Sequence, residues 1–198
     1  MQDTTKLDKL RKDIVFSADL AGEKLIFHST WGIFSPKEID VGTQLLVNLL
    51  EIEPGDSCLD LGCGYGPIGL YMARRAYQGE TLLVDKDFMA VDYANANARR
   101  NNLTNAKAIL SNAFDQIDSQ LEFDVIASNI PAKVGKEMLS LILNDAYSRL
   151  KPGGKLYVVT INGLRQYMKR NLTDVFSDYK KLKQGKTYTV ALARKLTD

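Results

Sequence analysis

The chain has 198 residues, of which 45% are hydrophobic and 25% are charged, and its net charge is +2. This composition supplies a sizeable core for about one domain, and no apolar run comes near the ~18 residues that a membrane span requires. The polar start also differs from a secretory signal, so we expect one cytoplasmic domain over residues 1–198 with no membrane contact.

The cysteines and the histidine limit the chemistry that the chain can perform. Cys58 and Cys63 are too few for a disulfide framework, and we interpret them as reduced thiols of a cytosolic protein. With His28 as the single histidine, we expect no zinc site and predict no metal. We interpret His28 as a hairpin or loop residue rather than a catalytic base.

The first elements predicted along the chain are a hairpin and a short helix. Alternating hydrophobicity over residues 13–29 predicts a β-hairpin that turns near Ala21 and Gly22. Residues 42–52 have helical spacing, with Thr43 as a candidate N-cap. We expect residues 1–30 to form an N-terminal extension with this hairpin, and residues 31–198 to form the core.

From residue 57 onward, short apolar segments alternate with segments of helical spacing. The predicted strands are 57–61, 81–85, 106–110, 123–128 and 155–161, followed by a closing hairpin of 179–184 and 188–195. The predicted helices are 66–77, 89–102, 136–150 and 164–176. The alternation predicts an α/β, Rossmann-like fold, in which a seven-stranded, mostly parallel sheet is covered by helices on both faces. Sheets of this class bind ligands at the carboxyl ends of their strands.

A glycine loop follows the first of these strands, in the segment LDLGCGYGPIG. Gly62, Gly64 and Gly66 give G-x-G-x-G, which lets the backbone turn sharply and approach a ligand closely. Glycine turns between strand and helix are common, so this motif alone is weak evidence. Asp60 at the strand end strengthens it, as does Asp85, which ends the next strand where a ribose-binding acid is expected.

Together with LLVDKD, this loop resembles the first two motifs of the class I S-adenosylmethionine-dependent methyltransferases. The resemblance implies that Asp60 lies near the amino group of the cofactor and that Gly62 and Gly64 leave room for it. It also implies that Asp85 accepts hydrogen bonds from both ribose hydroxyls, which suits an acceptor-only carboxylate. The expected cofactor-binding residues are Asp60, Gly62, Cys63, Gly64, Gly66, Asp85, Lys86, Asn112, Ala113 and Asn129.

Asn112 follows the third strand, in the segment SNAF. The family commonly has an acid there that accepts a hydrogen bond from the adenine amino group, and an amide oxygen can do the same. The alternative is a plain turn asparagine.

The fourth strand runs into SNIPAK. Amino-group methyltransferases of this superfamily often carry Asn-Pro-Pro-aromatic there, and the chain has Asn129, Ile130, Pro131 and Ala132. The resemblance makes Asn129, Ile130 and Pro131 the candidate catalytic residues, because an asparagine oxygen can accept an N–H of the amino group and proline stiffens the loop. Ala132 replaces the usual stacking ring, so Trp31 or Phe34 is a candidate substitute, unless both rings belong to the core.

The segment GIFSPKEIDVGTQLLV is similar to one that precedes the first motif in the small-domain group, which includes bacterial ribosomal RNA guanine-N2 methyltransferases and compact archaeal relatives. The similarity implies that it wraps the site. The expected substrate-binding residues are Trp31, Phe34, Asp40, Thr43 and Ala132. The bacterial ribosomal enzymes usually have an extra N-terminal domain, and only about thirty residues precede the shared core here.

Positive charge gathers near the C-terminus. Residues 164–198 hold nine Lys or Arg against three Asp, which could face a phosphate backbone or could simply be a solvated face. The leading hypothesis is a methyltransferase that acts on the exocyclic amino group of a guanine in ribosomal or other structured RNA, with a homo-oligomer as one way to hold the RNA. The alternatives are a protein side-chain amide or small amine as substrate, or a cofactor-binding subunit without catalysis.

Overall fold

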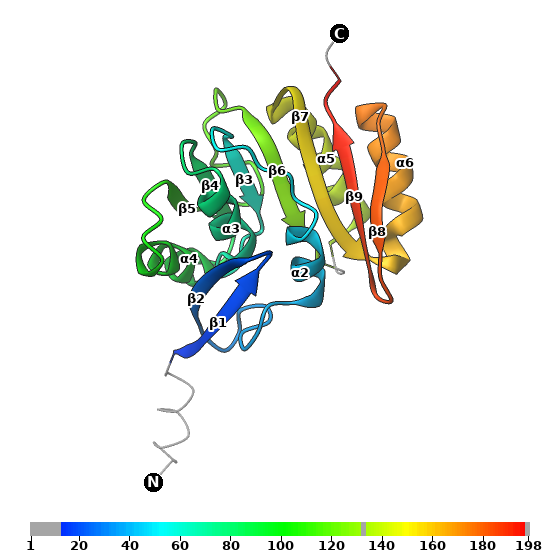
Figure 1. The fold of residues 1–198 in the computed structure, drawn as a ribbon. Coiled ribbons are helices and arrows are strands. Elements are labelled where there is room, and N and C mark those ends of the chain that lie inside the picture. The colour runs from blue at the N-terminus through cyan, green and yellow to red at the C-terminus, as the bar shows by residue number, and fades with distance from the viewer. Residues whose placement is uncertain (1–12, 132–133, 197–198) are drawn as a thin grey trace.

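The computed structural model describes residues 13–131 and 134–196. Within them, seven strands form one sheet in the order β5-β4-β3-β6-β7-β9-β8 (Figure 1). The strands are β3 (Cys58–Leu61), β4 (Thr81–Asp85), β5 (Ala106–Leu110), β6 (Phe123–Asn129), β7 (Leu150–Ile161), β8 (Lys180–Gln184) and β9 (Tyr188–Arg194). β3 to β7 pair in parallel, while β9 is antiparallel to β7 and β8. The predicted fold class is confirmed, including the closing hairpin.

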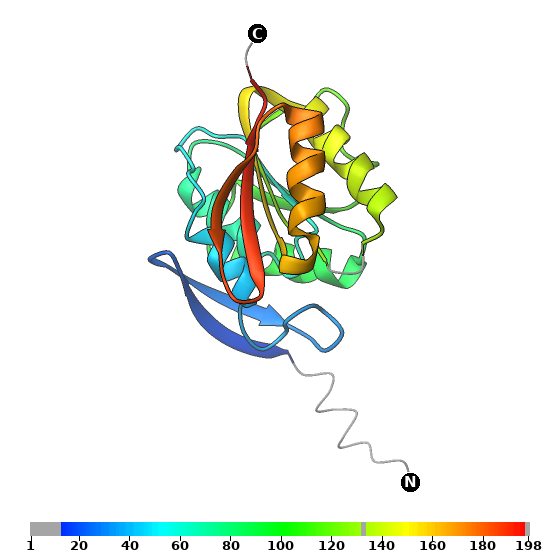
Figure 2. The ribbon, with the colours of Figure 1, turned by 90° about the vertical axis from the view of Figure 1, so that its right-hand side faces the viewer.

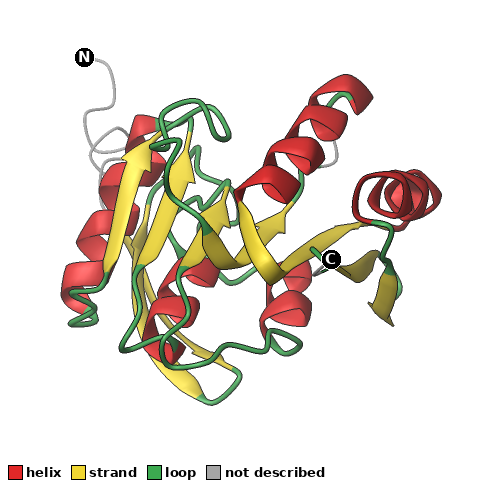
Figure 3. Ribbon diagram, turned by 90° about the horizontal axis from the view of Figure 1, so that it is seen from above, coloured by secondary structure: helices red, strands yellow, loops and turns green. Residues whose placement is uncertain are grey.

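Helices cover both faces of the sheet (Figure 3). They are α2 (Val41–Val47), α3 (Pro67–Arg75), α4 (Phe88–Arg100), α5 (Lys136–Arg149) and α6 (Arg165–Phe176), with a 3₁₀ turn η1 at Asn162–Leu164. α2, α3 and α4 contribute Leu46, Met72 and Val91 to one hydrophobic core. α5 and α6 contribute Leu139 and Leu172 to the core on the other face, and Figure 2 shows these two helices side by side. The alternating strands and helices of the sequence therefore give two separate cores, one on each face.

Two local predictions differ from the structure. The helix expected over residues 42–52 begins at Val41, and its N-cap is Asp40 rather than Thr43. Asp40 caps it because its carboxylate accepts from the first free backbone N–H groups, those of Gly42 and Thr43. The strand expected over residues 155–161 begins earlier, at Leu150, and the register of β7 with β6 shifts there as in a β-bulge.

The N-terminal hairpin pairs β1 (Ile14–Leu20) with β2 (Glu23–Ser29) and turns at Ala21 and Gly22, as predicted. Both turn residues have positive φ, 50° and 91°, as a tight hairpin turn of this hand requires. The hairpin packs against α4, where two side-chain amides replace a neighbouring strand. The side chain of Asn97 accepts a hydrogen bond from the N–H of His28 and donates one to its carbonyl. The side chain of Asn101 does the same with Ile26.

Candidate active site

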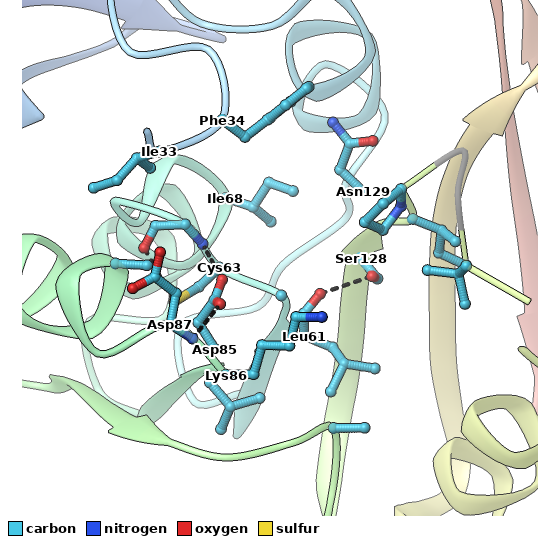
Figure 4. A pocket seen from close by; sticks show the side chains of 18 of the residues that line it. Ile33, Phe34, Leu61, Cys63, Ile68, Asp85, Lys86, Asp87, Ser128 and Asn129 are labelled. Atoms are coloured by element: carbon cyan, nitrogen blue, oxygen red, sulfur yellow. Dashed lines mark hydrogen bonds between the residues drawn. The ribbon is translucent and has the colours of Figure 1, made fainter. Parts of the chain in front are cut away.

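A cavity of about 680 Å³ opens where β3, β4 and β6 end, at the carboxyl edge of the sheet (Figure 4). Parallel strands bring the loops that follow them to this edge, so residues far apart in sequence meet there. The predicted site residues that line it are Phe34, Asp40, Thr43, Gly62, Cys63, Gly64, Asp85, Lys86, Asn112, Ala113, Asn129, Ile130 and Pro131.

Three predicted site residues do not line the cavity. Trp31 is exposed, and Lys37 Nζ lies 4.6 Å from the centre of its ring. Gly66 caps α3 with φ 99°, and its missing Cβ avoids Leu70 and Leu83. Asp60 is buried beneath the glycine loop. A fourth, Ala132, falls outside the described residues.

The glycine loop is fixed by its backbone. Gly62 and Cys63 both donate their N–H groups to the carbonyl of Val84 at 2.9 Å, which ties the loop to β4. Gly62 and Gly64 have φ values of 78° and 54°, a left-handed conformation that favours glycine. Burial raises the pKa of the Cys63 thiol, so it is not a nucleophile at neutral pH.

Asp85 stands at the end of β4, directly opposite the glycine loop. Its Oδ2 accepts the Gly64 N–H at 2.8 Å, and its Oδ1 accepts the Asp87 N–H at 3.0 Å. Two bonds leave lone pairs free on a carboxylate that has about four acceptor positions. The loop therefore orients Asp85 without using up its capacity to accept further hydrogen bonds.

Asp60 ties β3 to α3 rather than reaching the cavity. Its Oδ2 accepts the Gly69 N–H at 2.7 Å, and among the described residues its Oδ1 has no partner. A Cβ on Gly69 would lie 2.4 Å from side-chain atoms of Leu83, so only glycine brings α3 this close. Burial raises the pKa of Asp60 to about 7, the Gly69 N–H lowers it, and the charge of Asp85 raises it.

The loop after β6 brings the candidate catalytic residues to the cavity. Asn129 Nδ2 donates to Asp40 Oδ2 at 3.0 Å and to Thr43 Oγ1 at 2.9 Å. Ile130 is buried, and its N–H donates to the carbonyl of Val159 at 3.0 Å. A proline could not make that bond, so isoleucine at this position extends the pairing of β6 with β7.

Asn112 lies at the end of the cavity beside β5. Its Nδ2 donates to Asp115 Oδ2 at 3.1 Å, which leaves its side-chain oxygen as the acceptor. Ala113 follows with φ 51°, a conformation unusual for a residue other than glycine. Strained backbone of this kind is often found in functional loops.

Sequence reasoning missed the apolar wall of the cavity. This wall includes Met138 and Ile142 of α5 and Val134, which lies just before the helix. Met138 and Ile142 are four residues apart in the helix predicted over 136–150, so this spacing would have placed those two on one helix face. Tyr65 also lines it. Its hydroxyl hydrogen is shared between the carbonyls of Ser35, at 3.1 Å, and Glu38, at 3.2 Å, which holds the loop before α2 against the glycine loop.

Two other kinds of site are not found in the part of the chain that the structure describes. No three His, Cys, Asp or Glu side chains gather there as ligands for a metal ion. No helix in these ranges has the length and apolar character needed to cross a membrane. His28 lies in β2, as a hairpin residue, with its Nδ1 2.9 Å from Asp13 Oδ2.

The fold and cavity are those of a Rossmann-like methyltransferase. A glycine loop follows β3, an acid, Asp85, ends β4, and an amide, Asn129, ends β6. The family model described as the methyltransferase small domain matches residues 24–192. The chain therefore belongs to this family. The enzyme class and the cofactor predicted from the sequence, a methyltransferase that uses S-adenosylmethionine, are confirmed.

Curated relatives and solved structures agree with this assignment. The chain is 33% identical over 186 residues to the uncharacterized protein YbxB of Bacillus subtilis, covering 91% of each. It is 31% identical to ribosomal RNA small subunit methyltransferase C of Haemophilus influenzae, over 85% of this chain and 51% of that protein. Among solved structures, the 16S rRNA N2 G1207 methyltransferase (RsmC) of T. thermophilus, in complex with AdoMet and guanosine, gives 30% identity and a TM-score of 0.83 over 91% of this chain and 50% of that one. The chain thus spans about half the length of these two RNA methyltransferases.

The residues present fit S-adenosylmethionine. The cavity volume lies within the ~300–1,000 Å³ usual for small-molecule sites. No atom lies within 4 Å of the place where a Cβ would stand on Gly62, so the glycine loop leaves open space. Asp85 and Asn112 both keep acceptor capacity at the cavity, which suits the hydroxyl and amino donors of a nucleoside.

Proposed function

We propose that this protein methylates the exocyclic amino group of a guanine in ribosomal or other structured RNA. The observation that carries the proposal is the position of Asn129. It lines the same cavity as Asp85, and its two amide hydrogens are already bonded, so its oxygen is left to accept. Asp85, Asn112 and the glycine loop would hold the cofactor on the other side of the cavity.

The chemistry of an amino group on a base explains why an acceptor is needed. Its nitrogen is a poor nucleophile because the lone pair is delocalised into the ring. When bound, S-adenosylmethionine supplies an electrophilic methyl group. Asn129 Oδ1 would accept one N–H of the substrate, which orients the nitrogen and increases its electron density. Pro131 restricts the backbone that follows this acceptor.

Exposed aromatic rings support a planar substrate. Phe34 is 65% exposed and lines the cavity, and Trp31, three residues before it in the chain, is 47% exposed. Neither ring is part of the core, so the interpretation of both as core residues is wrong. Phe34 is the better candidate for stacking on a base, since Trp31 does not line the cavity.

The relatives support RNA as the substrate class. The name of the T. thermophilus structure gives a guanine N2 position in 16S rRNA, and guanosine is bound in that structure. The matched part is about half of that protein, so the substrate of this chain is inferred from its site. Exposed basic residues of the C-terminal hairpin, Lys180, Lys181, Lys183 and Lys186, support contact with phosphates.

The proposal is tested by transfer of tritiated methyl groups from S-adenosylmethionine. The acceptors are total RNA from a strain that lacks the gene, ribosomal subunits from that strain, and protein extract. We expect label in one RNA species, and loss of that label with Asn129→Ala. Asn144→Ala, at an exposed position of α5, is the matched control and retains the wild-type rate.

Other outcomes would redirect the assignment. Label in protein rather than RNA would favour a side-chain amide or amine as substrate. Binding of S-adenosylmethionine without label in any fraction would favour a subunit that binds the cofactor and does not catalyse. Either result contradicts the RNA proposal.

A further inference from the structure

We propose that Asp40, Thr43 and Tyr188 form a positioning network that fixes the side-chain amide of Asn129 in one orientation, in which its oxygen serves as the acceptor for a substrate. The functional consequence rests on the proposed amino-group methylation. The orientation itself does not.

The first step is the hydrogen bonding of the amide. Asn129 Nδ2 has two hydrogens, and they are donated to Asp40 Oδ2 at 3.0 Å and Thr43 Oγ1 at 2.9 Å. Rotation of the amide by half a turn would place its oxygen against the Asp40 carboxylate and lose a charge-assisted bond. The hydrogen-bond network therefore selects one of two amide orientations of nearly equal shape.

The second step is the immobilisation of Asp40. Its Oδ2 also accepts the N–H groups of Gly42 and Thr43, at 2.8 and 3.2 Å, in the first turn of α2. Its Oδ1 accepts the hydroxyl of Tyr188 at 3.0 Å. Burial and this bond raise the pKa of Tyr188, so it remains a donor at neutral pH. With the bond from Asn129, the carboxylate accepts four hydrogen bonds, which hold it in place beside Asn129.

The third step explains the glycine between Asp40 and Thr43. A Cβ on Gly42 would lie 3.1 Å from Cδ1 and Cε1 of Tyr188 and 2.8 Å from Asp40 Oδ2. Glycine therefore lets the tyrosine ring approach the start of α2. The segment DVGT supplies a cap, a gap for a ring and a hydroxyl acceptor, in that order.

The network joins three parts of the fold. Asp40 and Thr43 lie at α2, Asn129 ends β6, and Tyr188 begins β9, 148 residues beyond Asp40. Tyr188 pairs with Ile161 at the end of β7, the strand next to β6. The antiparallel C-terminal hairpin is therefore part of the support of the catalytic amide as well as the edge of the sheet.

The test combines nuclear magnetic resonance with kinetics. The side-chain ¹H–¹⁵N pair of Asn129, assigned by its loss in Asn129→Ala, reports the orientation without any substrate. We expect it to shift in Thr43→Val, which keeps the shape and removes the acceptor, and in Tyr188→Phe, which removes only the hydroxyl. Thr43→Ser should return the pair close to its wild-type position, and Tyr77→Phe, at an exposed tyrosine, should leave it in place.

Kinetics test the consequence for catalysis. We expect kcat to fall by roughly tenfold or more in Thr43→Val and Tyr188→Phe, while KM and the affinity for S-adenosylmethionine change little, because an interaction of the transition state is lost. Thr43→Ser should recover most of the lost rate. This split distinguishes a positioning role from a loss of folding, which would lower cofactor affinity and the melting temperature in parallel.

Two results would overturn the proposal. One is an unchanged Asn129 pair in both Thr43→Val and Tyr188→Phe, which would show that the contacts do not set the orientation. The other is a shifted pair with an unchanged kcat. If the wild-type enzyme methylates no RNA, the proposed function fails, and the resonance of Asn129 still decides the network. Should Thr43→Val not fold, Tyr188→Phe alone carries both measurements.

Discussion

The backbone N–H of Gly64 donates to Oδ2 of Asp85 at 2.8 Å, which joins the glycine loop after β3 to the acid that ends β4. The same carboxylate accepts the N–H of Asp87 on its other oxygen, at 3.0 Å. The glycine loop and Asp85, which together form the expected nucleoside site, are therefore fixed relative to each other before any ligand binds. Less conformational freedom then has to be lost on binding, which favours affinity.

The first prediction concerns Asp85. Asp85→Ala removes two acceptors of the expected ribose contacts and the brace on Gly64. We expect the Kd for S-adenosylmethionine to rise by about 10²- to 10⁴-fold, since bonds to a charged group contribute about 1.5–3 kcal/mol each. Asp85→Asn, which keeps one oxygen, should lie between. Isothermal titration calorimetry measures both, with Asp92→Ala on the exposed side of α4 as control. An unchanged Kd in Asp85→Ala would show that the acid does not hold the cofactor.

The second prediction concerns the pH dependence of stability through Asp60. The folded protein raises the pKa of this buried carboxyl from 3.8 to about 7, so between these values the folded state binds more protons than the unfolded state. The free energy of unfolding contributed by Asp60 is therefore highest below about pH 4 and decreases as the pH rises to about 7, by up to about 4 kcal/mol.

The variant Asp60→Asn separates this effect from packing. Asparagine keeps an oxygen for the Gly69 N–H and removes the charge. In urea unfolding between about pH 5 and pH 8, the free energy of unfolding of the variant should rise relative to that of the wild type as the pH rises. The variant has no buried charge at this position, whereas Asp60 becomes ionised. A difference between the two proteins that stays constant with pH would mean that Asp60 titrates normally in the fold.

The sequence predicted the parts of the site that depend on strand order. Asp85 and Asn129 line the same cavity because each directly follows an apolar strand, and parallel strands end at one edge. The sequence did not predict the burial of Asp60. All four residues of β3 are buried, on both faces of the sheet, so no alternation of polar and apolar residues indicates which way Asp60 points. Nor could it predict Tyr188, since a contact between residues 148 positions apart depends on how the closing hairpin packs on α2.

The third prediction concerns the docking of the N-terminal hairpin. Asn97 is fully buried and bonds the N–H and carbonyl of His28 and the carbonyl of Tyr65. Asn97→Ala leaves these backbone groups without partners, and we expect a loss of about 3 kcal/mol in the free energy of unfolding. Asn144→Ala, on the exposed side of α5, should change stability by less than about 0.5 kcal/mol. Denaturant unfolding compares the two, and equal stabilities would contradict the role of the buried amide.

The fourth prediction concerns Phe34. Stacking of a base on an aromatic ring contributes about 1–3 kcal/mol, so Phe34→Ala should raise KM for RNA by about five- to a hundredfold and leave the Kd for S-adenosylmethionine nearly unchanged. Phe34→Tyr keeps a ring and should retain most of the affinity. Trp31→Ala should have a smaller effect, because Trp31 does not line the cavity. If Phe34→Ala and Trp31→Ala both leave RNA affinity unchanged, neither ring replaces the missing aromatic of the loop after β6.

The fifth prediction decides between two interpretations of the basic hairpin. Lys180, Lys181, Lys183 and Lys186 are exposed on β8, the edge strand, and on its turn, where lysines can also serve to prevent pairing with other sheets. If they contact phosphates, changing all four to Gln should weaken RNA binding and reduce the slope of log affinity against log salt by about 3, since each neutralised phosphate contributes about 0.7–0.9. Changing Lys24 and Lys107, which are exposed on β2 and β5, provides the control for charge alone. A slope that falls by the same amount per lysine changed in both sets would indicate a general effect of net charge, and an unchanged slope in the hairpin variant would favour protection of the edge strand.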